Sequence, residues 1–125
     1  MILFKPEHVE LILSGRKTQT RRMGKKRWNV GAVHQARTRM MDADSTFARL
    51  RIVAVRREML GMMTEADARA EGYSDLGDYF GAFCRINHVG PASSIGGLPV
   101  WVVEFAATPA ETPEPPAPSL AGDPE

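Results

Sequence analysis

The sequence predicts a small α+β protein, a β-barrel of about five strands with two or three helices. Segments with the β-branched, apolar composition of strands are spread along the chain, and segments with helical spacing interrupt them at two places. A chain of 125 residues, 43% of them hydrophobic, is long enough for one buried core. We therefore expect one barrel domain at residues 1–106 and a disordered, proline-rich acidic tail at residues 107–125.

The first half of the chain predicts one helix among several extended segments. Pro6 suits the first turn of a helix, because its missing N–H would be unpaired there, and Gly15 marks the end of that helix. Apolar and β-branched residues favour strands in the rest of this half, and arginine is frequent in them. The expected strands and extended segments lie at residues 1–4, 17–23, 31–39 and 47–58.

Two short helices and a closing strand are expected in the second half. Thr64 and Asp67 form a pattern like a capping box, and Gly72 ends that helix. Ser74 with Asp75 and Asp78 opens the next. The run at residues 100–105 is mostly apolar, which indicates a strand buried in the barrel. In the second helix the apolar side chains recur at helical spacing, which predicts a core-facing stripe rather than a cofactor site. These side chains are Leu76, Tyr79, Phe80, Phe83 and Ile86.

The net charge of +1 conceals an uneven distribution of charge. Residues 1–60 contain 14 Lys and Arg against 5 Asp and Glu, whereas residues 61–125 contain 2 against 10. A basic half favours a phosphate-bearing partner, because Lys and Arg release counterions when they bind a nucleic-acid backbone. The alternative is that the two halves neutralise each other in the folded protein.

The densest group of potential anion donors follows Gly15. Five such side chains occur within seven residues, directly after a glycine that lets the backbone turn sharply. The glycine spacing differs from that of a Walker loop, so nucleotide hydrolysis by that route is not expected. In a regular strand Lys17 and Thr20 would point to opposite faces, so a bulge or turn is needed to bring them into one pocket. The five donors are Arg16, Lys17, Thr20, Arg21 and Arg22.

Other kinds of site and partner are not expected. Cys84 is the single cysteine, which excludes an internal disulfide. His8, His34 and His88 lie far apart without the spacing of paired metal ligands, so we predict no metal and no cofactor. The apolar start of the chain is broken at once by charged residues, which predicts no membrane span and a cytoplasmic protein.

Residues 1–105 resemble the ASCH family, which shares its barrel with PUA-like RNA-binding domains. The likeness consists of a strand and helix that lead into Gly15-Arg16-Lys17-Thr18, the basic strands, the helix at residues 64–72 and the closing strand Trp101-Val102-Val103-Glu104-Phe105. Members typically carry a glycine, a lysine two residues later, and an acid or hydroxyl residue followed by arginine. Here these are Gly15, Lys17, Thr20 and Arg22. The resemblance implies an ASCH-type barrel that binds RNA, a nucleoside or a nucleotide.

A narrower resemblance concerns Thr20, at a position where some ASCH members carry a carboxylate. It is similar to a subgroup of small bacterial amidohydrolases that deacetylate N4-acetylcytidine, and by local match it implies a catalytic set of Lys17, Thr20 and Glu71. These residue types could supply the base, the nucleophile and the proton donor of an amide cleavage. Lysine is a useful base only if its pKa falls, which nearby arginines favour and Glu71 opposes. Glu71 also meets the negative end of its helix dipole, a mild pointer to function.

Each of these residues also has a structural interpretation. Lys17 and Glu71 could be an ion pair that ties a helix to the barrel, and Thr20 is a common strand residue. Trp28, in basic surroundings, could stack a base or anchor the core, whereas Trp101 is expected in the core. Tyr73 is expected at the mouth of the pocket from its position alone.

Three functions remain open from sequence, in order of preference. The first is a binding module in which a basic pocket holds RNA or a nucleotide, because it needs only the charge pattern. The second is a small amidohydrolase acting on an acylated pyrimidine nucleoside. The third is a nuclease without a metal. The expected binding residues are Arg16, Lys17, Arg21, Arg22, Trp28 and Tyr73.

Overall fold

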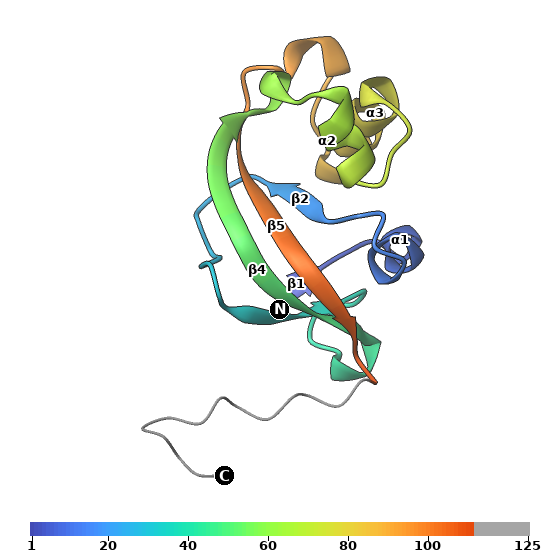
Figure 1. The fold of residues 1–125 in the computed structure, drawn as a ribbon. Helices are drawn as coiled ribbons and strands as arrows, with labels where there is room; N and C mark the ends of the chain where they lie inside the picture. The colour runs from blue at the N-terminus through green and yellow to red at the C-terminus, as the bar shows by residue number, and fades with distance from the viewer. Residues whose placement is uncertain (112–125) are drawn as a thin grey trace.

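A computed structural model describes residues 1–111 of the chain. Its five strands form one sheet in the order β1-β3-β4-β5-β2, in which β1 and β3 are parallel and the other neighbours are antiparallel. The long strands β4 and β5 curve together from the upper left to the lower right of Figure 1, and β2 pairs with β5 on its other side. The sheet therefore bends into a half-barrel. Its strands are β1 (Ile2–Leu3), β2 (Gln19–Arg22), β3 (Val33–Arg37), β4 (Thr46–Met59) and β5 (Pro99–Pro109).

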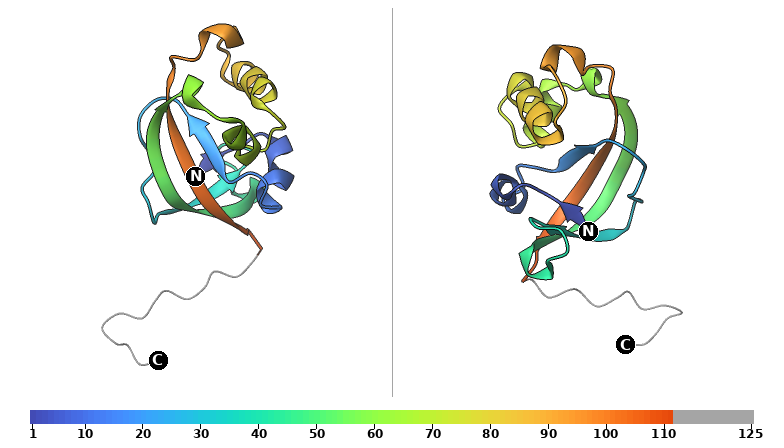
Figure 2. Two further views of the ribbon diagram at one scale, coloured as in Figure 1. Left: turned by 45° about the horizontal axis from the view of Figure 1, so that its top comes forward. Right: turned by 180° about the vertical axis from the view of Figure 1, so that it is seen from behind.

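Three α-helices lie on the same side of the β4–β5 pair, as both views of Figure 2 show. The helices pack beside one mostly antiparallel sheet, which confirms the α+β class. Helix α1 follows the first strand, while α2 and α3 fill the connection between β4 and β5. The α-helices are α1 (Val9–Leu13), α2 (Glu65–Ala70) and α3 (Leu76–Asn87), and the short 3₁₀ turns are η1 (Pro6–His8), η2 (Ala43–Ser45), η3 (Leu60–Met62) and η4 (Ala92–Ser94).

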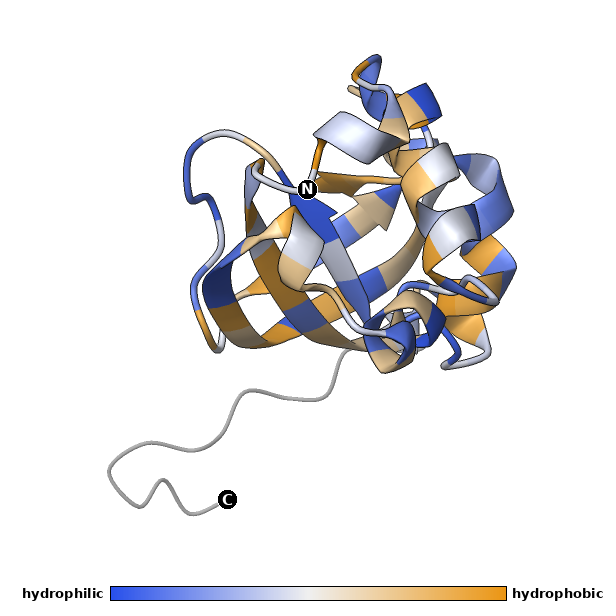
Figure 3. Ribbon diagram, turned by 90° about the horizontal axis from the view of Figure 1, so that it is seen from above, coloured by the Kyte–Doolittle hydropathy of each residue, from blue (hydrophilic) through white to orange (hydrophobic). Residues whose placement is uncertain are grey.

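Two groups of buried apolar side chains hold these layers together. One fills the half-barrel, around Leu50 and Ile52 of β4. The other joins the end of the barrel to α3, around Leu60, Tyr79 and Val100. Seen from above, hydrophobic (orange) and hydrophilic (blue) residues alternate along parts of the strands (Figure 3). Because successive side chains of a strand point to opposite faces, this pattern separates apolar from polar side chains. Burying a side chain such as Leu50 stabilises the fold by about 1.5–3 kcal/mol.

The end of the sheet differs from the sequence expectation. Residues 107–109 were assigned to a disordered tail, but β5 continues through Pro109. The reason is the length of β4, which offers ladder partners as far as Ala48, opposite Pro109. The remaining part of the expected tail, from residue 112 onward, lies outside the described residues.

Both expected helix starts are present as hydrogen-bonded caps. The Thr64 side chain accepts from the Asp67 N–H, and the Asp67 carboxylate accepts from the Thr64 N–H, which completes a capping box. The next helix is capped by Asp75 rather than by Ser74, since the Asp75 side chain accepts from the Asp78 N–H at 2.8 Å. These caps fix where α2 and α3 begin, and Glu71, at the C-cap of α2, belongs to the site described below.

Replacing Thr64 by alanine should lower the free energy of unfolding by about 1 kcal/mol, because one N–H in the first turn of α2 loses its acceptor. Urea denaturation of the wild type and Thr64→Ala measures this. Thr64→Ser keeps the hydroxyl and should stay close to the wild type; an equal loss in both variants would contradict the capping interpretation.

Candidate ligand pocket

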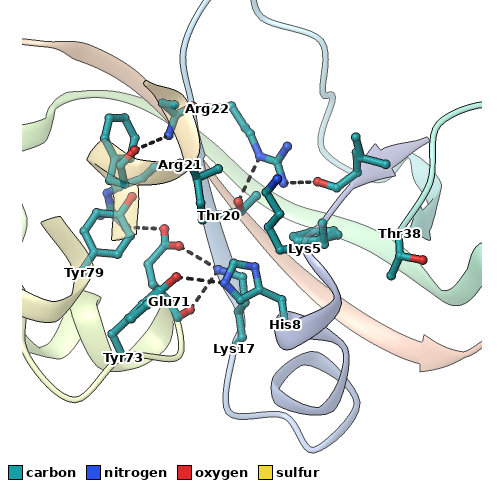
Figure 4. A pocket seen from close by; sticks show the side chains of 15 residues that line it. Lys5, His8, Lys17, Thr20, Arg21, Arg22, Thr38, Glu71, Tyr73 and Tyr79 are labelled. Carbon is teal, nitrogen blue, oxygen red and sulfur yellow. Dashed lines mark hydrogen bonds and ion pairs between the residues drawn. The ribbon is translucent and has the colours of Figure 1, made fainter. Parts of the chain in front are cut away.

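A pocket of about 310 Å³ opens between the edge strands of the half-barrel, η1 and the α2–α3 region. The edges β1 and β2 are not neighbours in the sheet, so the barrel has a seam there. Figure 4 shows polar side chains from several elements converging on this space. Its lining residues are Leu3, Phe4, Lys5, His8, Lys17, Thr20, Arg21, Arg22, Thr38, Glu71, Tyr73, Tyr79, Phe83, Ile86 and Asn87.

The turn after α1 brings Lys17 against the end of α2. Gly15 has a positive φ of 80°, which reverses the chain, and the Lys17 N–H then donates to the Leu11 carbonyl at 2.9 Å. Gly72 permits the close approach, since a Cβ on it would lie 2.8 Å from Leu11 Cδ1. The Lys17 side chain can therefore reach Glu71.

Lys17 and Glu71 form a buried ion pair at the floor of the pocket. Their side chains are 1% and 3% exposed, and Lys17 Nζ lies 2.8 Å from Glu71 Oε1. Nζ also donates to the Glu71 backbone carbonyl at 2.9 Å, which satisfies an acceptor left unpaired at the helix end. The sequence expectation that these two residues meet is thus matched by the geometry.

Arg21 completes the surroundings of the Glu71 carboxylate. Its Nη1 lies 3.0 Å from Glu71 Oε2, and its Nη2 lies 3.1 Å from Glu58 Oε1 and 3.5 Å from an Asp67 oxygen. It also donates to the Gln19 side chain. Three carboxylates thus face one buried guanidinium. The charge of Arg21 is consequently compensated within the protein, and less of it is available to a ligand.

Burial dominates the ionisation of Lys17. Desolvation lowers the pKa of this amine, Glu71 raises it through charge and hydrogen bonding, and Arg22 and Arg21 lower it. The net direction is downward. The direction that sequence left undecided is thus downward, so the neutral form of the Lys17 amine, which can accept a proton, is easier to reach than in an exposed lysine.

Arg22 lies at the seam between the two edge strands. Its Nε donates to Thr20 Oγ1 at 3.1 Å, its Nη2 donates to the Leu3 carbonyl at 2.8 Å, and its guanidinium carbon lies 4.9 Å from the centre of the Phe4 ring. All three partners are uncharged. Among residues 1–111, no carboxylate lies within 4.0 Å of Arg22, and its Nη1 donates to no protein group.

Thr20 shares the pocket with Lys17 but is not bonded to it. Lys17 comes before β2, in the turn, so both side chains can line one space although they are three residues apart. In Figure 4 the Thr20 hydroxyl is directed to Arg22, on the far side from Glu71. The expected set of Lys17, Thr20 and Glu71 is therefore gathered in one pocket, with only the Lys17–Glu71 pair in direct contact.

Tyr73, expected at the mouth of the pocket, lines it, but sequence reasoning missed His8, Tyr79 and Phe83 as lining residues. His8 Nε2 lies 2.9 Å from the Tyr73 hydroxyl, and the ring of Tyr73 packs edge-on against that of Tyr79. Burial, Lys17 and Arg22 lower the pKa of His8 to about 4, while burial raises the pKa of Tyr73. His8 had been considered only as a metal ligand. Tyr79 and Phe83 were assigned to a core stripe, and they are indeed buried, but they also line the pocket.

Two of the expected binding residues lie away from this pocket. Arg16 is exposed, and its Nε donates to Ser14 Oγ at 3.2 Å. Trp28 is only 7% exposed and packs in the half-barrel, so its side chain is a core anchor rather than a stacking platform in this pocket. Trp101, expected in the core, is partly exposed and packs against the edge of the core, where Arg57 stacks on its ring and its Nε1 donates to the Gly24 carbonyl.

The fold is that of several solved ASCH structures. An ASCH domain from Lactobacillus crispatus superposes with a TM-score of 0.56 at 16% identity, over 81% of this chain and 70% of that one. ASCH from Zymomonas mobilis superposes with a TM-score of 0.60 at 15% identity, over 83% of this chain and 64% of that one. The chain has the ASCH-domain fold. A DUF984 protein from Enterococcus faecalis gives a TM-score of 0.61 at 17% identity, over 89% of this chain and 76% of that one.

No protein-family model and no curated protein matches this chain. The chain also spans only 64% of the Zymomonas ASCH protein, and the identities of 15–17% to the three structures establish the fold alone. The function must therefore be argued from the pocket itself.

None of the helices within residues 1–111 has the length and apolar character needed to span a membrane. The same residues contain no group of three or more His, Cys, Asp or Glu side chains placed to hold a metal ion.

Proposed function

We propose that this ASCH domain binds a nucleoside unit that carries an anionic group, with the anion at Arg22. The observation that carries the proposal is the state of the Arg22 guanidinium at the pocket wall. It has lost part of its hydration, its protein partners are uncharged, and Nη1 has no partner among residues 1–111. An arginine fork in this state is suited to a phosphate oxygen.

The rest of the pocket suits a sugar and a base. Its volume of about 310 Å³ is at the lower end of the range for small-molecule sites and fits one such unit rather than a duplex. Tyr73, Tyr79 and Phe83 provide aromatic surface for a base, and Thr38 and Asn87 provide hydrogen-bonding groups. Because Glu71, Glu58 and Asp67 already surround Arg21, Arg22 is the cation that best supports recognition of an anion.

Replacing Arg22 by glutamine should weaken binding of a ribonucleoside 5′-monophosphate by about 10- to 100-fold, because a charge-assisted hydrogen bond is lost. Isothermal titration with the four ribonucleoside monophosphates, and with the corresponding nucleosides, measures this.

The matched control is Arg16→Gln, which removes one exposed positive charge close by in sequence but outside the pocket. It should change the dissociation constant less than about twofold, as expected for a screened surface charge. Equal weakening in both variants would show that general electrostatic attraction, and not the pocket, provides the affinity.

A second candidate function is hydrolysis of an acyl amide on such a nucleoside, and the buried Lys17–Glu71 pair favours it. Water and N4-acetylcytidine would give cytidine and acetate. In the proposed route a proton first passes from Lys17 Nζ to Glu71 within the pair. Thr20 Oγ1 then attacks the acyl carbon while its proton passes to the neutral Lys17 Nζ, and Glu71 gives the transferred proton to the departing cytidine amine. Water then hydrolyses the threonine ester. The lowered pKa of Lys17 supports its part as the base.

The amidohydrolase candidate predicts that the wild type releases cytidine from N4-acetylcytidine and that Thr20→Val does not. Valine keeps the shape of the buried Thr20 side chain, so a loss of turnover would reflect the missing hydroxyl. Chromatography of the nucleoside measures release. Lys17→Met should also be inactive, provided that circular dichroism shows it to be folded. Absence of release by the wild type would exclude this candidate and leave the binding function intact.

A further inference from the structure

A second hollow, of about 580 Å³, lies beside the ligand pocket and shares Arg22 with it. Six of its nine lining residues are apolar, and three of these, Met1, Met23 and Met40, are exposed. Exposed apolar side chains gathered at one hollow are typical of a docking site. Methionine is flexible and adapts its shape to the side chain of a partner. The second hollow therefore suits a partner that brings an apolar side chain.

The second hollow also contains a polar atom without a partner. His34 lines the hollow, and its Nε2 is buried with no hydrogen-bond partner among residues 1–111. Buried polar atoms in folded proteins are nearly always hydrogen-bonded. A group that enters the hollow from outside the described residues can supply the missing partner.

The rim of the second hollow is positively charged. Arg27 lines the hollow, and Lys25 and Lys26 precede it in the chain. All three side chains are exposed, and none has a carboxylate within 4.0 Å among the described residues. Carboxylates on an occupant would be attracted to this rim. The hollow thus fits an acidic segment that carries an apolar side chain.

The chain itself contains such a segment at residues 112–125, called here the acidic segment. It has three acids, Glu114, Asp123 and Glu125, and no Lys or Arg. Leu120 is its one large aliphatic side chain. Since Asp123 and Glu125 follow Leu120 closely, a leucine placed in the hollow would bring two acids near the basic rim.

The described chain ends near enough for the acidic segment to reach the second hollow. In the sheet Pro109 is paired with Ala48, and Ala48 is paired with Ala36. Ala36 is paired in turn with Ile2, which lines the hollow. Three strand spacings separate Pro109 from Ile2, which is about 15 Å. Leu120 follows Pro109 by 11 residues, which span up to about 34 Å at about 3.1 Å per residue.

We propose that the second hollow is the docking site of the acidic segment of the same chain. Leu120 packs against the exposed methionines, and Asp123 and Glu125 lie at the basic rim around Arg27. An attached segment acts at an effective concentration on the order of millimolar, so a weak contact is enough. The proposal does not depend on the proposed function, because no nucleotide takes part in it.

The test compares NMR amide spectra of the ¹⁵N-labelled full chain in the wild type, Leu120→Ser and Ala117→Ser. Leu120→Ser removes the apolar side chain and should shift the amides of Met23, Arg27 and Met40, which are distant in sequence. Ala117→Ser is the matched control, because it makes a small change in the same segment without touching the leucine. It should leave those three amides in place.

A reciprocal variant tests the same contact from the second hollow. Arg27→Glu reverses a charge at the rim and should shift the amides of Leu120 and Asp123. Arg16→Glu reverses an exposed charge outside the hollow and should not shift them.

Three outcomes would overturn the proposal. The first is a Leu120→Ser spectrum in which only amides of the acidic segment change. The second is an equal effect of Arg27→Glu and Arg16→Glu, which would show general attraction between charges rather than docking. The third is a wild-type spectrum in which the amides of the hollow move on dilution, because the occupant would then come from a second copy of the chain.

Discussion

Replacing Glu71 by glutamine should lower the free energy of unfolding by about 3–5 kcal/mol, because two buried cations lose their shared carboxylate. Lys17 Nζ and Arg21 Nη1 lie 2.8 and 3.0 Å from the two Glu71 oxygens, and both side chains are almost fully covered. Glutamine keeps the volume and one acceptor but presents an NH₂ group to one cation. Urea denaturation at neutral pH measures the loss.

The matched control is Glu10→Gln, which removes an exposed carboxylate from α1 and should change stability by less than about 0.5 kcal/mol. A second variant isolates the pair: adding Lys17→Met to Glu71→Gln should recover part of the loss, since the uncompensated Lys17 charge is removed. Additive losses in the double variant would contradict the proposed coupling between Lys17 and Glu71.

The protein should lose roughly 3 kcal/mol of stability between pH 6.5 and pH 4 through His8 alone. The pKa of His8 is lowered from 6.5 to about 4 in the folded protein. Between these values the unfolded chain binds a proton that the folded protein does not, so acidification favours unfolding. The contribution is fully present above pH 6.5. Urea denaturation at pH 7 and pH 4.5 measures it.

The difference between the two pH values should shrink in His8→Gln, whose side chain does not titrate. Glutamine can still reach the Tyr73 hydroxyl, which limits the loss of packing. The control is His88→Asn, because His88 is exposed and asparagine tolerates its left-handed backbone. If His8→Gln kept the full pH dependence of the wild type, the acid sensitivity would arise from groups other than His8.

The order of the elements was predictable because each carries a local signal. Pro6 and Gly15 bracket the first helical region, and Thr64 with Asp67 forms the cap that their spacing indicated. The extension of β5 to Pro109 was not predictable, because the composition of residues 106–109 resembles the tail that follows. Only the length of the partner strand β4 decides it.

The site was predictable in two ways: from local charge density, and from the family resemblance for residues far apart in the sequence. Lys17 and Arg22 stood out from local charge density, but Glu71 was linked to Lys17 by family likeness alone. His8 and Tyr79 could not be identified, since a histidine in a first helix and a tyrosine in an apolar stripe usually have structural roles. That they line the pocket depends on how α3 packs across the seam of the barrel.

The measurement that tests the central proposal most directly is an NMR titration of the ¹⁵N-labelled protein with ribonucleoside 5′-monophosphates. If the pocket binds the nucleoside and Arg22 binds its phosphate, the largest amide shifts should fall at Thr20, Arg22, Tyr73 and Tyr79, and they should be absent in Arg22→Gln. Shifts confined to residues 25–27, or shifts that persist unchanged in Arg22→Gln, would contradict a pocket built around Arg22 and leave only a nonspecific attraction of phosphate to the basic surface.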